Sequence, residues 1–226
     1  MSNQNTSEIR RGQNQLVSFL WIRRSIGLLG FFFPLILILG AKSFSDCPDV
    51  LSSLSDYYHT IMRDVFAILM GFLAFAFFTY RGPEKIDGII ANLTGICALA
   101  IVFFSTSIKE DAGACVTCDM TTYKTVHFIF ASLFFLLLSY FSLFLFTKTE
   151  KNSVPTLEKI QRNRIYRICG VIMLFSIVVI GIYLLWLKKN GIWTDVPIVL
   201  IFEWLALWAF GISWIVKGDW FIMIDK

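Results

Sequence analysis

The chain has 226 residues, of which 57% are hydrophobic and 16% charged, and its mean hydropathy is +0.70. A soluble domain of this length could not bury that much apolar surface, so the composition excludes an ordinary soluble domain. The formal net charge of +4 reflects an uneven distribution of basic residues among the loops, and it indicates no nucleic-acid partner.

Six apolar stretches follow one another along the chain, each close to the roughly 20 residues that a helix needs to cross a bilayer. They cover residues 25–41, 65–80, 88–108, 125–147, 168–187 and 196–216. The second reaches spanning length only if residues 61–64 belong to it, and Glu203 interrupts the sixth. The sequence therefore predicts an all-α polytopic bundle of six transmembrane helices over residues 25–216. A polar, interfacial N-terminus (1–24) and a short tail (217–226) flank it.

The first apolar stretch is expected to be a retained helix. A cleavable signal also places an apolar segment after basic residues, but it ends in a small-x-small site. Residues 39–41, Leu-Gly-Ala, match that pattern poorly.

Basic residues are distributed unequally between alternate loops. Fourteen of the twenty Lys and Arg fall in the N-terminus, the second and fourth loops and the C-terminal tail, whereas five fall in the other loops. Cytoplasmic loops carry an excess of Lys and Arg. Both termini of this multi-pass cell-membrane protein are therefore expected in the cytoplasm.

Three cysteines fall in loops on the predicted outer side, where disulfides persist. Cys47 lies in the first loop, and Cys115 and Cys118 lie in the third. One disulfide can form among them, and the pairing stays open: Cys47 with either of the others, or Cys115 with Cys118. The Cys-x-x-Cys spacing also suits a redox dithiol, but no thioredoxin-like pattern surrounds it, which favours a structural bridge.

The stretch SLSDYYHTIMRD, residues 53–64, places many polar groups just before the second apolar run. Ser53 followed by Asp56 has the form of a capping box, so a helix is expected to start at residue 54. In one continuous helix, Asp56, Thr60 and Arg63 would share a stripe, with Arg63 in reach of Asp56. Asp64 would lie on another flank.

Ionisable residues gather at one predicted depth. Glu203 is about seven residues into the last helix, or roughly 10 Å deep, where an ionised carboxylate needs a partner or water. His127 and residues 105–107 lie near the same outer level. The sequence therefore predicts a polar pocket that opens outward. Its candidate residues are Asp56, His59, Arg63, Asp64, His127 and Glu203. The alternative is a structural network in which Arg63 pairs with one of the three carboxylates and locks helices together.

Sequence motifs for catalysis are scarce. The two histidines, His59 and His127, could join one carboxylate around a zinc ion, but no H-E-x-x-H or similar spacing is present. No G-x-S-x-G, P-loop or dinucleotide fingerprint occurs. No resident metal and no cofactor are therefore expected.

Several segments resemble those of a group of bacterial six-helix integral membrane proteins of unknown function. They are SLSDYYHTIMRDVF, the YRG turn, HFIFASLFF, RNRIYRICG and FEWLALWAFGISWIVKG. The six-helix layout with a polar motif before the second helix is similar, more distantly, to the DRAM/Sfk-like family. Neither resemblance implies a reaction. LSDYYHTI is also similar in texture to a stretch of alkaline ceramidases, but those hydrolases use a three-histidine zinc site and a seventh helix that this chain lacks.

The expected function is to bind or move a small molecule or lipid, with Arg63 holding an anionic group and Glu203 as a protonatable partner. An alternative is a membrane-embedded, ceramidase-like lipid hydrolase that uses His59 or His127 with carboxylates, with or without a metal. A third is a purely structural or assembly role. Membrane lipids and a small-molecule ligand are the expected partners.

Overall fold

A computed structural model describes residues 2–45, 50–106, 123–148 and 156–219, and the regular secondary structure in these ranges is helical throughout. This confirms the all-α fold class. The main helices are α1 (Ser2–Phe44), α2 (Arg63–Thr79), α3 (Lys85–Phe103), α4 (Lys124–Tyr140), α5 (Leu157–Ile182) and α6 (Ile198–Lys217). Shorter elements are the 3₁₀ helices η1 (Leu54–His59) and η5 (Lys188–Asn190) and the π-helical turns η3 (Phe141–Leu145) and η4 (Tyr183–Leu187).

Five of the helical segments in the described ranges are long and apolar enough to cross a membrane. They are Leu20–Phe44, Lys85–Phe103, Lys124–Leu145, Leu157–Asn190 and Ile198–Lys217. The helix α2 has 17 residues, which is shorter than the roughly 20 that span the hydrocarbon. Five segments thus support the membrane character of the chain. The remaining predicted span, the second along the chain, corresponds to α2 and is the shortest of the six.

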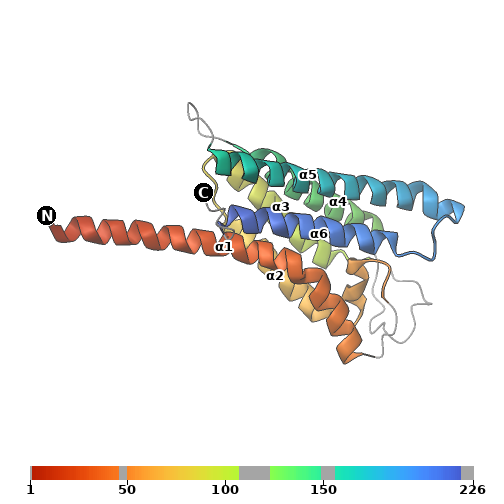
Figure 1. The fold of residues 1–226 in the computed structure, drawn as a ribbon. Coiled ribbons are helices and arrows are strands. Elements are labelled where there is room, and N and C mark those ends of the chain that lie inside the picture. Colours follow the sequence, from red (N-terminus) through yellow and green to blue (C-terminus); the bar gives the residue numbers. More distant parts are fainter. Residues whose placement is uncertain (1, 46–49, 107–122, 149–155, 220–226) are drawn as a thin grey trace.

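The six α-helices are grouped in one bundle (Figure 1), and the contacts between them connect them into a closed ring. Each helix packs against the next one along the chain, and α6 closes the ring by packing against α1. The side chain of Arg24 donates a hydrogen bond of 2.7 Å from Nε to the carbonyl of Gly218, directly after α6. The chain therefore enters the bundle through α1 at the end where α6 leaves it, which we call the terminal end. The opposite end, which holds η1 and the start of α6, is the distal end.

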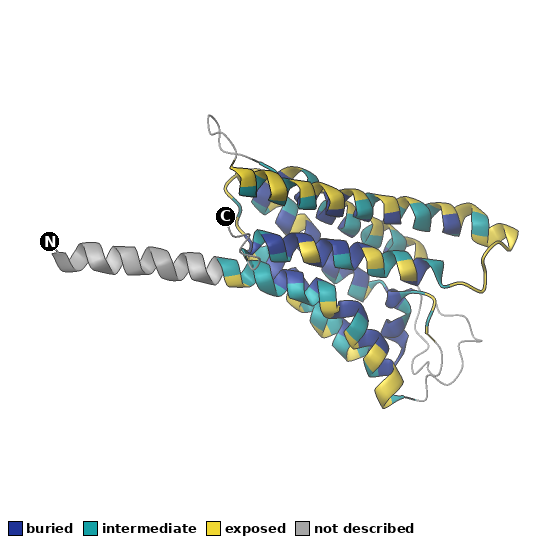
Figure 2. Ribbon diagram, in the orientation of Figure 1, coloured by how far each residue is buried: buried dark blue, intermediate teal, exposed yellow. Residues whose placement is uncertain are grey.

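Aromatic rings fill the centre of the ring of helices. Trp214 of α6 is completely buried, and its ring centroid lies 5.4 Å from that of Phe77, 5.3 Å from that of Phe141 and 5.0 Å from that of Phe146. Buried residues occupy the inward faces of the helices, as Figure 2 shows. Close-packed aromatic side chains of this kind contribute most of the dispersion energy of the core.

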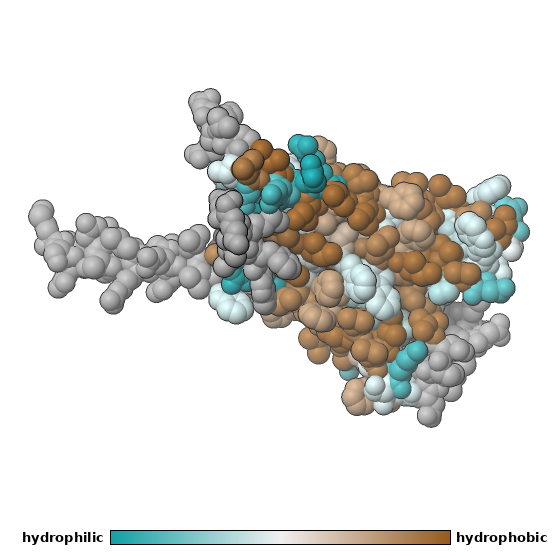
Figure 3. All heavy atoms as spheres, viewed as in Figure 1, coloured by the Kyte–Doolittle hydropathy of each residue, from teal (hydrophilic) through white to brown (hydrophobic). Residues whose placement is uncertain are grey.

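The flanks of the bundle are apolar. Their exposed side chains include Ile68, Phe75, Ile129, Phe175 and Leu185. Figure 3 shows hydrophobic residues over the length of the bundle and hydrophilic residues toward its two ends. An apolar band of this extent is typical of a surface in contact with lipid rather than water.

Two glycines let α1 and α6 approach at backbone distance. A Cβ atom added to Gly211 would lie 2.8 Å from the carbonyl oxygen of Gly27 and 2.8 Å from the amide nitrogen of Phe31. A Cβ on Gly27 would lie 2.7 Å from the amide nitrogen of Ile215. Only residues without a side chain fit this crossing, as in other membrane helix pairs that associate through small residues.

The expected continuous helix from residue 54 is wrong. Ser53 does cap a helix, since its Oγ accepts a hydrogen bond of 3.1 Å from the amide of Ser55. That helix is η1, which ends at His59, because Thr60 is extended (φ −104°, ψ −176°). The Thr60 hydroxyl donates to the Tyr57 carbonyl (2.8 Å) and accepts from the Met62 amide (3.1 Å). These bonds satisfy the backbone at the break, and α2 begins afresh at Arg63.

Candidate functional site

The distal end of the bundle holds a group of buried and partly buried polar residues, which we call the distal polar cluster. Its members come from η1 and the residue before it, from the end of α3, from α4 and from α6. They are Ser53, Ser55, Asp56, His59, Thr106, His127 and Glu203. Four of the six residues that the sequence singled out therefore lie together here.

Glu203 of α6 is held by the start of η1. Its carboxylate accepts hydrogen bonds from the backbone amide of Leu54 (2.7 Å) and the hydroxyl of Ser53 (2.8 Å). The amide of Leu200, in the first turn of α6, donates to the carbonyl of Ser52 (3.0 Å). Hydrogen bonds that run in both directions thus hold the start of α6 against the start of η1. Bonds to an ionised carboxylate are stronger than those between neutral groups.

The two other singled-out residues lie outside this cluster. Arg63 has its guanidinium over the ring of Tyr58, at 5.4 Å from the centroid, and the donors to Glu203 in the described part of the chain are Ser53 and Leu54. The alternative in which Arg63 pairs with one of three carboxylates is therefore not supported for Glu203 within the described residues. Because α2 starts at Arg63, no continuous helix brings Asp56 and Arg63 onto one stripe. Asp64 is exposed in the first turn of α2.

His127 connects α4 to both α3 and η1. Its Nδ1 lies 2.7 Å from the carbonyl oxygen of Phe104, and its Nε2 lies 3.0 Å from the hydroxyl of Ser55. A carbonyl only accepts, so Nδ1 carries a proton, and in the neutral ring Nε2 accepts from Ser55. The tautomer is thereby set so that the free electron pair of the imidazole faces a serine hydroxyl.

Electrostatic interactions connect four ionisable groups of the cluster pair by pair, and we call this series the line of ionisable groups. Glu203 acts electrostatically on Asp56, Asp56 on His59, and His59 on His127. His59 Nε2 also lies 3.5 Å from the hydroxyl of Thr106. Burial raises the pKa of Asp56 above its ordinary value, and the hydrogen bond from the Ser52 hydroxyl (2.7 Å) opposes that rise.

The sequence did not identify Ser55 as a residue of the site, and it predicted no contact for residues 105–107. Ser55 and His127 are 72 positions apart, so no local spacing reveals their contact. The one available signal was that both fall at the same predicted depth. Across the described ranges, no three His, Cys, Asp or Glu side chains converge as metal ligands.

The cysteine predictions concern other parts of the chain. Cys47, Cys115 and Cys118 lie outside the described residues. Cys97 and Cys169 are buried within α3 and α5 as free thiols.

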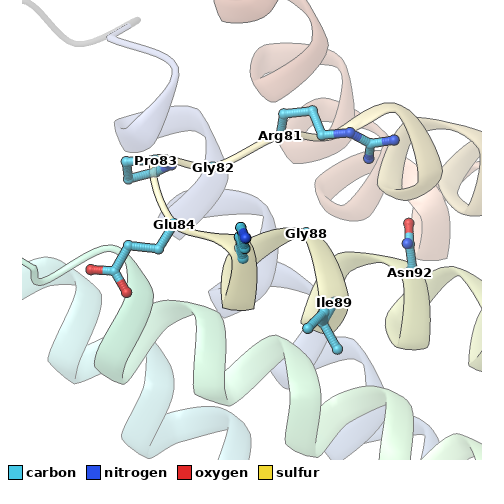
Figure 4. A pocket seen from close by; sticks show the side chains of 8 residues that line it. Arg81, Gly82, Pro83, Glu84, Gly88, Ile89 and Asn92 are labelled. Atoms are coloured by element: carbon cyan, nitrogen blue, oxygen red, sulfur yellow. The ribbon is translucent and has the colours of Figure 1, made fainter.

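Two pockets lie away from the distal polar cluster. One, of about 420 Å³, is formed at the turn between α2 and α3 and is lined by Arg81, Gly82, Pro83, Glu84, Lys85, Gly88, Ile89 and Asn92. In Figure 4 its Arg81 and Asn92 lie on one side and Glu84 on the other. The second, of about 540 Å³, is an apolar groove between α1 and α2, lined by Ser25, Leu28, Leu29, Phe32, Ile36, Ile68, Leu69 and Phe72.

Comparison with protein families, with curated proteins and with solved structures gives no match. The site is therefore interpreted from its own geometry.

Proposed function

We propose that this protein crosses the membrane six times, with both termini in the cytoplasm and the distal end outside. Support comes from α2, which lies between α1 and α3 in the ring and exposes Ile68, Phe72 and Phe75 to the same apolar flank. The excess of Lys and Arg in the N-terminus, the second and fourth loops and the tail supports the orientation. Labelling of single cysteines from each side of the membrane tests it, and a label at residue 189 from inside would contradict it.

The distal polar cluster then binds or moves a small molecule or a lipid at the outer surface. The observation that supports this best is the line of ionisable groups from Glu203 through Asp56 and His59 to His127. Buried ionisable groups in membrane proteins are costly, and they are typical of substrate and proton pathways. Packing alone would be served by apolar residues at the same positions.

A ligand screen with a matched pair of variants tests this function. Purified protein is heated with a panel of phospholipids, sugars, amino acids and small anions, because a ligand that binds the folded state raises the unfolding temperature. Asp56→Asn removes the charge at the centre of the line, and Asp64→Asn makes the same change at an exposed site on α2. We expect a ligand that binds the wild type and Asp64→Asn alike, and Asp56→Asn about fivefold or more weakly. Equal binding by Asp56→Asn, or no ligand at all, would contradict the proposal.

A second candidate, acyl hydrolysis, is favoured by the bond between Ser55 and His127. The Ser55 oxygen would attack an acyl carbonyl of a lipid while its proton passes to Nε2 of His127, and the Phe104 carbonyl would steady the protonated ring. The proton then goes to the departing alcohol or amine. Water, activated by the same nitrogen, releases the acid and restores the serine.

Reaction with a fluorophosphonate probe tests this candidate directly. We expect one label at Ser55, none in Ser55→Ala, and labelling slowed about 100-fold or more in His127→Gln. Ser52→Ala is the control, because Ser52 is exposed and bonded to Asp56 rather than to histidine. An unlabelled protein, or a label that persists in Ser55→Ala, would rule the candidate out.

A further inference from the structure

Positive charges converge between the helices at the terminal end. Lys217, the last residue of α6, is within electrostatic reach of Arg23 of α1 and of Lys159 and Arg162 of α5. All four side chains are partly buried. Topological charge normally sits in loops, whereas these four cations lie on helices and are partly buried.

The carboxylates that the structure describes at this end pair with only some of the cations. Glu158 and Asp219 both form ion pairs with Arg162, and Glu84 and Asp87 both pair with Lys148. Lys159 and Lys217 have no carboxylate within ion-pair distance in the part of the chain that the structure describes. Lys159 donates instead to the carbonyl of Phe146 (2.9 Å). Among the described residues, these two ammonium groups therefore form no ion pair, and Asp219, which acts on Lys217 electrostatically, is itself paired with Arg162.

Lys217 is positioned by aromatic rings. Its Nζ lies 5.3 Å from the ring centroid of Phe146 and 5.9 Å from that of Tyr166. Cation–π contacts of this kind hold an ammonium in place but satisfy none of its hydrogen-bond donors. The group remains able to donate to an anion.

Two further donors at the terminal end find no acceptor among the described residues. Nε1 of Trp214 and Nε of Arg162 are buried there without a hydrogen-bond partner. The Trp214 ring packs on Phe146, the ring that Lys217 also contacts, and Arg162 is within electrostatic reach of Lys217. Buried unsatisfied donors are rare in native proteins, and a bound ion commonly explains them.

We infer that Lys217, Lys159, Arg162 and Trp214 form a binding site for a phosphate group, supplied by an anionic phospholipid of the leaflet at the terminal end. A phosphate presents several strong acceptors and the negative charge that these side chains lack. Basic pockets between membrane helices at headgroup depth bind such lipids. The site is separate from the distal polar cluster and does not depend on the function proposed for it.

Lipid nanodiscs of two compositions test the site. The unfolding temperature is measured in phosphatidylcholine alone and in phosphatidylcholine with phosphatidylglycerol, and then in phosphatidylcholine with inorganic phosphate at constant ionic strength. We expect phosphatidylglycerol to stabilise the wild type. In Lys217→Gln the apparent affinity should fall about fivefold, as expected for one lysine near an anionic headgroup.

Two variants separate a lost site from a damaged fold. Lys217→Arg keeps the charge and should retain the phosphatidylglycerol effect. Lys189→Gln removes a lysine that is exposed after α5 at the distal end, and it should behave as the wild type. Stabilisation by inorganic phosphate that Lys217→Gln abolishes would support the site and assign free phosphate as its ligand. An equal response of Lys217→Gln and Lys189→Gln, or no response to either phosphate source, would overturn the inference.

Discussion

Gly211→Ala is expected to destabilise the protein by about 2–3 kcal/mol. The added methyl group would lie 2.8 Å from two backbone atoms of α1, the carbonyl oxygen of Gly27 and the amide nitrogen of Phe31. A side chain can rotate away from such a contact, but a helix backbone cannot, so α1 and α6 would have to separate along their whole interface. The apparent unfolding temperature in detergent should fall by roughly 5–10 °C.

Gly181→Ala is the matched control. Gly181 also lies inside a helix, α5, but a Cβ there would meet no atom within 4 Å. Alanine is the better helix former, so this variant should be as stable as the wild type or slightly more so. If both substitutions have the same effect, the close crossing of α1 and α6 does not limit stability.

Glu203→Leu is expected to cost about 2–3 kcal/mol. The substitution leaves the amide of Leu54 and the hydroxyl of Ser53 buried without their acceptor, and it removes the strongest link between η1 and α6. Glu203→Gln keeps one acceptor oxygen and should lose about half as much. Hydrogen exchange is the sharper measurement, because the amide of Leu54 should exchange much faster in the leucine variant while the amides of α3 are unaffected.

Asp64→Asn serves as the control for Glu203→Gln, since it changes an exposed carboxylate to an amide. It should leave both the unfolding temperature and the exchange at Leu54 unchanged. Normal protection of Leu54 in Glu203→Leu would show that other contacts hold η1 in place.

Hydrophobicity predicted where the helices lie, because membrane helices need long apolar stretches. The predicted stretch at 196–216 agrees closely with α6, and the stretch at 88–108 agrees with α3 to within a few residues. The helix boundaries near polar segments were less predictable. Residue 54 starts a helix as expected, but the Thr60 hydroxyl competes for backbone groups and divides η1 from α2, which periodicity alone does not reveal.

The sequence predicted the depth of the candidate site in the membrane, but it did not predict the contacts between the residues of the site. A carboxylate in an apolar helix needs partners, so Glu203 stood out at once. Its partners are a serine hydroxyl and a backbone amide, and a backbone amide carries no signal in the sequence. Ser55 was missed for a similar reason, since serine is common and only the three-dimensional arrangement places it against His127.

Closure of the ring by α6 bears on how the protein is made. The bond from Arg24 to Gly218 joins residues 194 positions apart, so α1 meets its main partner only after α6 has been synthesised. A nascent chain that stops before α6 would lack both this partner and the carboxylate that binds η1, so α1 and η1 both wait for α6 before they reach their native contacts.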